Sequence, residues 1–376
     1  MSTMTAEAES DVRLPYLRKY GWQSMAYSSL QKGMEYFLLP DVGYVSFSPI
    51  QGKVVTPVVL GDPICDRQNM GQMIDAFIAK YDDPIFMHIT APTAKILEQR
   101  GFYINEIGVE TLIDVQQFTT KGGPKETLRQ QCNRAKKDGL HVGELDIREV
   151  SKEEQKSITD EWLNKKANHD NELGFLVRPA VYDDELDVRK FFALKEWKIQ
   201  GFVFFDPIYE NGEVIGYMAN ILRTLGHLPY SLTDYIIVEA IGRLRQEGKK
   251  VLSLGWSPFV HVEDDGQFKH SKPLKELFRY TYDHCNYLYA FQSLAFHKDR
   301  YRPGLENTQQ QKVYAATRHL LPVHMLHEIF RKMGMHPVTQ TGECAIKCIN
   351  EAIAGVPAEL KKLLAATGKH LEHHEH

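Results

Sequence analysis

Asp234 combines a carboxylate, which can move a proton, with a position at the start of a predicted helix. It follows Ser231-Leu232-Thr233, and residues 233–247 carry apolar side chains at helical spacing. The helix dipole stabilises an acid in the first turn, which is a sufficient structural reason for its presence. A carboxylate here could also accept the proton of an attacking alcohol or hold an ammonium group. Asp234 is therefore the first catalytic candidate, and the structural explanation stays open beside it.

A basic cluster formed by Lys298, Arg300 and Arg302 is the second group of candidates. Residues 298–332 hold seven Lys or Arg against three acids, whereas the whole chain has 45 Lys plus Arg against 49 Asp plus Glu. On an edge strand such side chains could simply face solvent. Concentrated cations also suit phosphate groups, and Lys or Arg can stabilise a tetrahedral oxyanion. The cluster predicts phosphate contact, with Lys298 and Arg300 as catalytic candidates and Arg302 in substrate binding.

Four further side chains are candidates for substrate binding. Glu172 precedes Gly174-Phe175 in a predicted loop, where a surface glutamate is the ordinary explanation. The others are the aromatic residues Trp256, Tyr289 and Phe291. Such rings usually belong to a core, but they can also stack on a nucleobase. Cys and His residues do not show zinc spacing, so we expect no metal site.

Two successive units of strands and helices must position these residues. The first unit predicts strands at 34–39, 43–50 and 53–60, a helix at 71–81, a strand at 84–89, a helix at 93–100 and a strand pair at 102–108 and 110–115. The second predicts strands at 195–205 and 213–222, a helix at 233–247, a strand at 250–254, a helix at 273–283 and strands at 287–296 and 312–316. This repeated order predicts an α/β fold of tandem N-acetyltransferase-like (GNAT) domains, with mixed central sheets flanked by helices.

The predicted organisation has five parts. Residues 1–10 are expected to be disordered, 11–120 to form an N-terminal GNAT-like domain, 121–155 a connector, 156–320 a C-terminal catalytic GNAT-like domain and 321–376 a helical tail. No apolar run approaches the roughly 20 residues that cross a bilayer, and the polar N-terminus is unlike a secretory signal. We expect a cytoplasmic protein whose contact with the inner face of the membrane is peripheral. The amphipathic segment 322–333 is the candidate for that contact, or alternatively packs on the catalytic domain.

The acyl donor is the next question that the predicted fold raises. Acetyl-CoA needs a glycine-rich R/Q-x-x-G-x-G/A turn, whose N–H groups bind pyrophosphate at a helix N-terminus. The nearest string runs from Arg245 to Lys250, where Lys stands in place of the required Gly or Ala, and it lies at a helix end. The sequence therefore favours a donor other than CoA.

Short strings in a fixed order are spread over residues 15–317. They are Leu60-Gly61-Asp62-Pro63, Arg100-Gly101-Phe102, Ile107-Gly108-Val109-Glu110, Leu128-Arg129, Asn133-Arg134-Ala135, Glu161-Trp162-Leu163, the segment 172–175, Leu254-Gly255, Tyr289-Ala290-Phe291, Lys298-Asp299-Arg300-Tyr301-Arg302-Pro303 and Tyr314-Ala315. By their order and spacing they resemble one family, the C-terminal synthase domain of bacterial phosphatidylglycerol lysyl- and alanyltransferases, the multiple peptide resistance factors. The chain departs from the family at Ser293 and Ala295, where the family has Gly and Arg, and at Ser257, where it has Ala.

The resemblance implies transfer of an amino acid from aminoacyl-tRNA, the donor substrate, onto the hydroxyl of phosphatidylglycerol or a related lipid, with no metal, no CoA and no other cofactor. The implied partners are aminoacyl-tRNA and an anionic lipid or membrane surface, and the implied form is a free-standing synthase without the family's membrane-spanning half. Asp234 falls where the family has an aspartate, and Glu172 is implied to hold the aminoacyl group. Two alternatives stay open: a soluble acyltransferase acting on a small amine or peptide, and a non-catalytic module that binds tRNA or anionic membrane.

Overall fold

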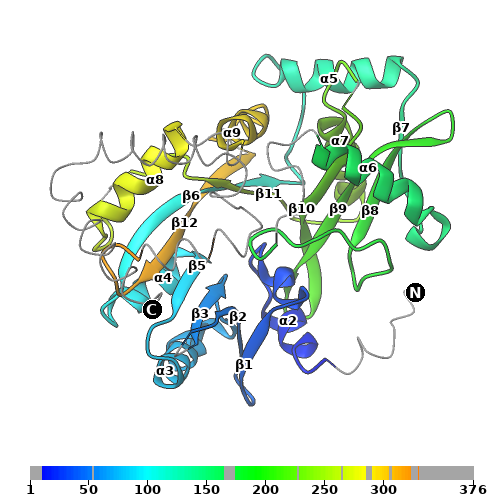
Figure 1. Cartoon of the computed structure of the whole chain (residues 1–376). Coiled ribbons are helices and arrows are strands. Elements are labelled where there is room, and N and C mark those ends of the chain that lie inside the picture. Colours follow the sequence, from blue (N-terminus) through cyan, green and yellow to red (C-terminus); the bar gives the residue numbers. More distant parts are fainter. Residues whose placement is uncertain are drawn as a thin grey trace, which may run out of the picture.

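The computed structural model describes residues 11–52, 55–164, 174–226, 228–263, 266–284, 290–304, 307–322 and 329. In this part of the chain, twelve strands form one mixed sheet (Figure 1). Its order is β1-β2-β3-β5-β12-β6-β11-β10-β9-β8-β7, with the short β4 paired to β2. The sheet therefore runs without interruption from one half of the chain to the other.

The first half supplies the strands at one side of this sheet. Pairing of β1 with β2 and of β2 with β3 is antiparallel, whereas β3 and β5 are parallel and joined through α3. The elements are α2 (Leu14–Tyr20), β1 (Glu35–Leu39), β2 (Gly43–Ile50), β3 (Thr56–Leu60), β4 (Ile64–Cys65), α3 (Met70–Lys80), β5 (Ile85–Ile89), α4 (Ala91–Glu98) and β6 (Tyr103–Asp114).

The second half repeats this order. Antiparallel strands β8, β9 and β10 lead through α7 to β11, which is parallel to β10. The elements are α5 (Glu126–Lys137), β7 (His141–Glu144), α6 (Lys152–Asn164), β8 (Arg189–Lys195), β9 (Lys198–Glu210), β10 (Glu213–Thr224), α7 (Leu232–Gln246), β11 (Val251–Pro258), α8 (Lys272–His284), α9 (Phe291–Asp299) and β12 (Thr308–Thr317).

The two halves exchange their last strands. β12, from the second half, lies between β5 and β6 of the first half. β6 in turn pairs with β11 of the second half. Figure 1 shows β6 and β12 as long neighbouring strands at the centre of the sheet. Each half therefore completes the sheet of the other.

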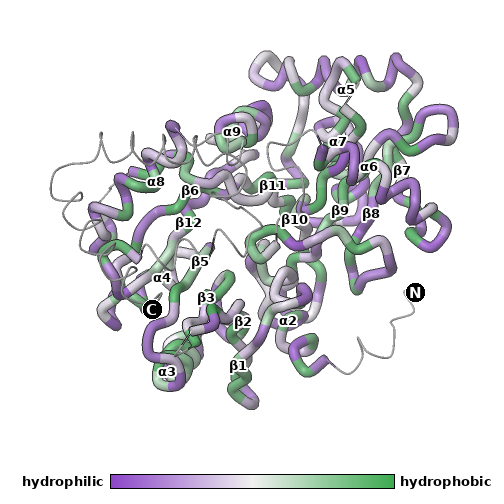
Figure 2. Tube along the Cα trace, in the orientation of Figure 1, coloured by the Kyte–Doolittle hydropathy of each residue, from purple (hydrophilic) through white to green (hydrophobic). Residues whose placement is uncertain are grey.

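Apolar residues on both faces of the sheet hold the helices in place. On one face of the second half, Ile236 and Leu244 of α7 pack with Phe205 of β9. On the other face, Ile158 of α6 packs with Phe202. The strands of this region are rich in aromatic and β-branched residues, which favour a pleated, buried surface. Figure 2 shows the resulting hydrophobic stretches along β9 and β10.

The predicted repeat of strands and helices is confirmed, with four corrections to individual elements. The strand predicted at 287–296 is wrong, because α9 begins at Phe291 and turns Ala295 and Lys298 inward at helical spacing. The two strands predicted at 102–115 are one strand, β6. The helical connector contains a strand, β7, that joins the sheet, and β8 was not predicted. The separate central sheets predicted for the two halves are a single sheet, because the halves exchange strands. Residues 1–10 and most of the predicted tail lie outside the described residues.

Candidate active site

Strands β10 and β11 part near the middle of the sheet. Their parallel pairing covers three positions and ends where Met218 of β10 faces Ser253 of β11. Beyond this point β10 continues beside β9 to Thr224, whereas β11 continues beside β6 to Pro258. The gap opens towards the carboxyl ends of two parallel strands, which is where open α/β sheets bind their ligands.

A bulge in β11 lies at the point of divergence. The register with β6 shifts between Ser253 and Trp256, and Gly255 between them has a φ of 76°. The backbone N–H of Gly255 donates to Ser253 Oγ at 2.9 Å, and Ser253 Oγ lies 2.5 Å from Glu110 Oε1 on β6. A left-handed backbone at this position favours glycine. The bulge turns carbonyl groups out of the ladder, where a side chain can reach them.

Lys298 is the side chain that reaches them. It extends from α9, is 4% exposed, and its Nζ donates to the carbonyl oxygens of Gly255 at 2.8 Å and Trp256 at 2.7 Å. Burial lowers the pKa of Lys298 to about 7, although the charge of Glu110 opposes this shift. An amine that is half protonated near neutral pH can both donate and accept a proton. Lys298 is thus a buried acid or base at the strand opening.

His88 of the first half approaches the same region. It lies in β5 with a φ of 59°, and its ring makes an edge contact with that of Trp256, with centroids 5.7 Å apart. Its Nε2 is buried and has no hydrogen-bond partner among the described residues. The pKa of His88 is lowered, chiefly by burial and also by the charge of Lys298, while the charge of Glu110 opposes this shift. His88 was not singled out from the sequence, because a lone histidine in an apolar strand predicts only a core residue.

Asp234 occupies the first turn of α7 and is fully buried. One carboxylate oxygen, Oδ2, accepts from Arg300 Nη1 at 2.6 Å, and the other, Oδ1, accepts from the Tyr301 hydroxyl at 3.0 Å. His297 Nδ1 lies 3.4 Å from Oδ1. Ser231 caps the helix by accepting from the backbone N–H of Asp234. Both oxygens of the predicted catalytic carboxylate therefore hold residues at the end of α9.

The end of α9 consequently bridges the strand opening. Lys298 fixes it to β11, and Arg300 with Tyr301 fixes it to α7. Arg300 keeps 24% of its side chain exposed and stacks over the ring of Phe296, 66% of which is exposed. The structure thus brings together the three predicted catalytic residues, and it leaves the Arg300 guanidinium at the rim of the opening.

The predicted substrate-binding residues are more dispersed. Trp256 lies on the bulge and donates from Nε1 to the carbonyl oxygen of Ile107. Phe291 is 2% exposed and packs in an apolar cluster with Phe259 and Met218, so it belongs to the wall behind the opening. Arg302 donates from Nε to the carbonyl oxygen of Pro124. Glu172 and Tyr289 lie outside the described residues.

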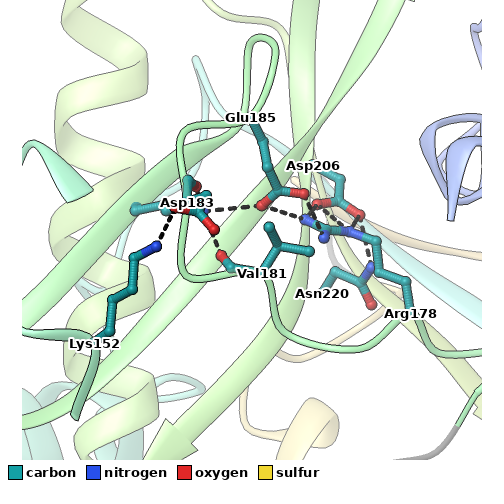
Figure 3. Close-up of polar contacts among 8 residues, drawn as sticks. Lys152, Arg178, Val181, Asp183, Glu185, Asp206 and Asn220 are labelled. Atoms are coloured by element: carbon teal, nitrogen blue, oxygen red, sulfur yellow. Dashed lines mark hydrogen bonds and ion pairs between the residues drawn. The ribbon is translucent and has the colours of Figure 1, made fainter. Parts of the chain in front are cut away.

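A buried ion network behind the opening was missed from the sequence (Figure 3). Arg178 is 3% exposed and donates from Nε and Nη2 to the carboxylate of Asp206. Asp206 lies on β9, opposite Met218 of β10. Arg178 Nη1 donates to Glu185 at 2.7 Å, and Glu185 also pairs with Lys190 at 2.9 Å. Burial alone would lower the pKa of Arg178, but the charges of Asp206 and Glu185 raise it. The network fastens residues 174–188 to the sheet.

No obvious sequence signal marks this network, because its members are far apart and of types that usually face solvent. Asn220 Nδ2 adds a bond of 2.6 Å to Asp206 from a bulge in β10. The two cations and two acids balance, as buried charges must. The loop they hold brings Phe175 and Leu176 against Met218, beside the last paired position of β10 and β11.

Two searches of the described residues bear on cofactors and membranes. They contain no group of three or more His, Cys, Asp or Glu placed to hold a metal ion. Among the helices of the same part of the chain, none has the length and apolar character needed to span a bilayer.

The fold and the strand opening define a tandem acyltransferase-like α/β protein. A family model described as "Phosphatidylglycerol lysyltransferase, C-terminal" matches residues 15–314. The chain therefore belongs to the family of the phosphatidylglycerol lysyltransferase C-terminal domain, and the resemblance seen in the sequence is confirmed.

Relatives and solved structures agree with this family. The phosphatidylglycerol lysyltransferase of Bacillus subtilis (strain 168) is 25% identical over 252 residues, which cover 65% of this chain and 28% of the relative. That of Staphylococcus aureus (strain COL) is 24% identical, covering 77% and 34%. The chain thus spans about a third of the length of these relatives.

Two solved structures share the fold. L-PGS from Bacillus licheniformis superposes with a TM-score of 0.69 and 21% identity, covering 89% of this chain and 99% of that one. The C-terminal domain of a putative lysylphosphatidylglycerol synthetase from Agrobacterium fabrum gives a TM-score of 0.67 and 19% identity, covering 84% and 93%. FemX is more distant, at a TM-score of 0.50 and 10% identity.

Proposed function

We propose that this protein transfers an amino acid from aminoacyl-tRNA onto a hydroxyl group of phosphatidylglycerol. The observation that carries the proposal is the opening between β10 and β11, bridged by α9, with the Lys298 amine at its inner end and the Arg300 guanidinium at its rim. Membership of the family supports the lipid acceptor. Catalysis belongs to the C-terminal half, residues 156–320, with Glu110 and His88 contributed by the strands of the first half.

The reaction is an acyl transfer between two oxygens. The lipid hydroxyl oxygen attacks the ester carbonyl carbon of the aminoacyl-tRNA, and a tetrahedral oxyanion forms. The bond to the terminal ribose oxygen then breaks, and that oxygen leaves with the proton that the lipid hydroxyl lost. No energy source beyond the ester is required, because one ester replaces another.

Lys298 has the properties needed to carry that proton. Its neutral amine can donate to the two carbonyls of the bulge while its lone pair accepts the hydroxyl proton, and its charged form has a third N–H for the oxyanion. A pKa of Lys298 of about 7 keeps both forms populated near neutral pH. We assign Lys298 as the proton carrier.

Arg300 and Asp234 take complementary roles in this scheme. The Arg300 guanidinium, partly exposed at the rim, contacts the lipid phosphate through a charge-assisted hydrogen bond. Asp234 acts as a positioning residue, since its two oxygens hold Arg300 and Tyr301 in place. Arg302, Trp256, Tyr289 and Glu172 stay as proposed contacts to the two substrates.

The segment between β10 and α7 supports tRNA over CoA as the donor. In a CoA-dependent fold of this kind, the loop that enters this helix must present several backbone N–H groups to pyrophosphate. Residues 225–231 contain one glycine, Gly226, and also Pro229, which has no N–H to donate. The string Arg245 to Lys250 lies at the end of α7 and in the turn that follows it. Neither segment suits a pyrophosphate.

The proposal is tested by incubating the purified protein with charged tRNA and phosphatidylglycerol micelles. We expect aminoacyl-phosphatidylglycerol, detected by mass spectrometry, and we expect ribonuclease pretreatment to abolish it. Acetyl-CoA consumption without a tRNA requirement would instead identify a CoA-dependent acyltransferase. Binding of tRNA or lipid without product would identify a binding module, and either result would refute the proposal.

A further inference from the structure

Trp197 is the most exposed large hydrophobic residue in the described part of the chain, with 95% of its surface accessible. It lies at the tip of the hairpin that joins β8 to β9. Lys195 and Lys198 are the last paired residues of these strands, so Glu196 and Trp197 form a two-residue turn. A tryptophan presented in this way cannot be explained by packing.

The backbone of the turn does not explain Trp197 either. Glu196 has a φ of 50° and Trp197 a φ of 65°, a left-handed pair that favours Asn-Gly. The hairpin between β9 and β10, at the opposite end of the sheet, has that preferred pair, Asn211-Gly212, with φ values of 53° and 89°. The chain thus places two unfavourable residues at one tip and the favoured pair at the other. An unfavourable residue at a strained position points to a function.

Two lysines, Lys195 and Lys198, flank the turn that carries Trp197. Lys195 and Lys198 face each other across the strands, a like-charge pair that is unfavourable in isolation. Lys195 Nζ pairs with Asp138 at 2.9 Å, whereas Lys198 is exposed. Lys137, at the end of α5, is also exposed beside Asp138. Two acids lie beside the tip, Asp138 and also Glu154, whose Oε1 accepts from the backbone N–H of Ile199 at 3.0 Å. Within the tip itself, residues 195–198, two cations accompany one acid, and the two lysines that flank Trp197 suit an anionic partner surface.

The tip lies at the same end of the sheet as the strand opening. Gly201, near the start of β9, pairs with Thr224, the last residue of β10. The loop after β10 leads to Tyr230, whose hydroxyl lies 2.5 Å from the same Asp138 that pairs with Lys195. α7 begins just beyond Tyr230. The hairpin, the end of α5 and the start of α7 therefore form one continuous surface next to the proposed site.

We propose that this hairpin tip, residues 195–198, docks the protein on an anionic phospholipid bilayer. Trp197 enters the boundary between headgroups and acyl chains, where tryptophan is favoured, and Lys195 and Lys198 lie at the level of the phosphates. This inference rests on the proposed function in one respect: the lipid substrate lies in that same bilayer, next to the opening that must receive it.

The test uses the full chain and vesicles of phosphatidylcholine with and without phosphatidylglycerol. Binding is measured by flotation, and insertion by quenching of tryptophan fluorescence with lipids brominated on their acyl chains. The chain has four tryptophans, so the contribution of Trp197 is the difference between the unmodified protein and Trp197→Asn. Asparagine suits the turn, so this variant should keep its fold, which circular dichroism checks.

We expect the unmodified protein to bind vesicles that contain phosphatidylglycerol and to be quenched by brominated lipid. Trp197→Asn should reduce its partition onto them by about tenfold or more, the effect of withdrawing one aromatic side chain from an apolar boundary. Lys198→Glu should weaken binding mainly at low salt. As a matched control, Asn211→Trp in the Trp197→Asn background puts a tryptophan at the other hairpin and should not restore binding.

Several results would overturn the docking surface: equal partition of the unmodified protein and Trp197→Asn, absence of vesicle binding, or restoration by Asn211→Trp. If Trp197→Asn lost affinity for tRNA but bound vesicles as well as the unmodified protein does, the docking surface would also be overturned, because Trp197 would then be assigned to stacking on nucleic acid. The readouts do not depend on turnover. Trp197-dependent insertion without aminoacyl-lipid product would therefore support docking and refute the proposed function. Formation of the product without Trp197-dependent insertion would support the proposed function and refute docking.

Discussion

The Nζ atom of Lys298 lies 2.8 Å from the carbonyl oxygen of Gly255, a residue with a φ of 76° in the bulge of β11. This contact fixes a helix of the second half to the strand that pairs with the first half. It also places the amine where its protonation depends on the fold, since burial lowers the pKa of Lys298 to about 7. Stability and activity should therefore depend on pH through the same group.

Lys298→Met should remove part of the pH dependence of stability. An unfolded lysine keeps its proton up to a pKa near 10.5, whereas folded Lys298 loses it above about 7. Between these values the unfolded state binds more protons, so the free energy of unfolding rises with pH, by at most about 1.4 kcal/mol per pH unit. Below pH 7 this contribution is flat. Urea unfolding at pH 7.0 and 9.5 should show a smaller rise for Lys298→Met than for the unmodified protein.

Lys125 provides the matched control for this measurement. It is buried at the start of α5, where its Nζ donates to Asn307 Oδ1 at 2.6 Å, and burial lowers its pKa to about 8. Lys125→Met should remove a rise in the free energy of unfolding that is confined to pH 8 to 10.5. It should leave the dependence of turnover on pH unchanged. An identical stability profile for Lys298→Met and the unmodified protein would show that Lys298 keeps an ordinary pKa.

Asp234→Asn should lower turnover by roughly two orders of magnitude, because the neutral amide no longer holds Arg300 by an ion pair. Asparagine keeps the size of the side chain, whereas alanine would also leave the buried Tyr301 hydroxyl without its acceptor. Asp75→Asn removes an exposed pair with Arg100 and is the control, with turnover expected within a factor of two. More than half of the activity in Asp234→Asn would exclude Asp234 from the site.

Arg300→Lys tests the phosphate contact. Lysine keeps the charge but lacks the planar fork of guanidinium, so it cannot contact Asp234 and a phosphate together through separate nitrogens. We expect a rise in KM for phosphatidylglycerol of roughly tenfold, the scale of one charge-assisted hydrogen bond. A loss confined to kcat would place Arg300 at the oxyanion instead. Wild-type kinetics in both Arg300→Ala and Lys298→Ala would show that the active site lies elsewhere.

Arg178→Met should destabilise the fold by about 3 to 5 kcal/mol, because it leaves Asp206 buried without its cation. The comparison is Arg178→Met with Asp206→Leu, which removes both charges and should recover part of this loss. Chemical unfolding of the two variants gives the measurement. If the single variant lost less than about 1 kcal/mol, the network would not anchor residues 174–188.

Much of the fold was predictable because its signals are local. The helix at 71–81 and the strand at 84–89 follow from side-chain periodicity within each segment, and the structure has α3 and β5 there. The prediction of a strand at 287–296 failed because the aromatic residues there suit a strand. The inward residues of α9, which are Phe291, Ala295 and Lys298, follow a helical period. Periodicity over so short a segment does not separate the two.

The candidate site could be predicted only through residue types and family motifs. Asp234, Lys298 and Arg300 stand out as charges in a recurring order, and the structure brings them together. Their contacts could not be predicted, since Lys298 is buried by a bulge that only the pairing of β11 with β6 reveals. The same holds for Arg178 and Asp206, which meet across 28 positions of the chain. Long-range pairing decides which charges are buried, and one sequence does not specify it locally.

The exchange of β6 and β12 has a consequence for synthesis on the ribosome. β12 is the last described strand to be made, yet it must enter between β5 and β6, which emerge before β7 to β11 exist. At about 5 to 20 residues per second, these two strands wait on the order of ten seconds or more with unpaired edges. The nascent N-terminal half therefore cannot close its sheet before β12 has been made. Its strand edges stay open to chaperones, or to a neighbouring nascent chain, until residue 317 has been added.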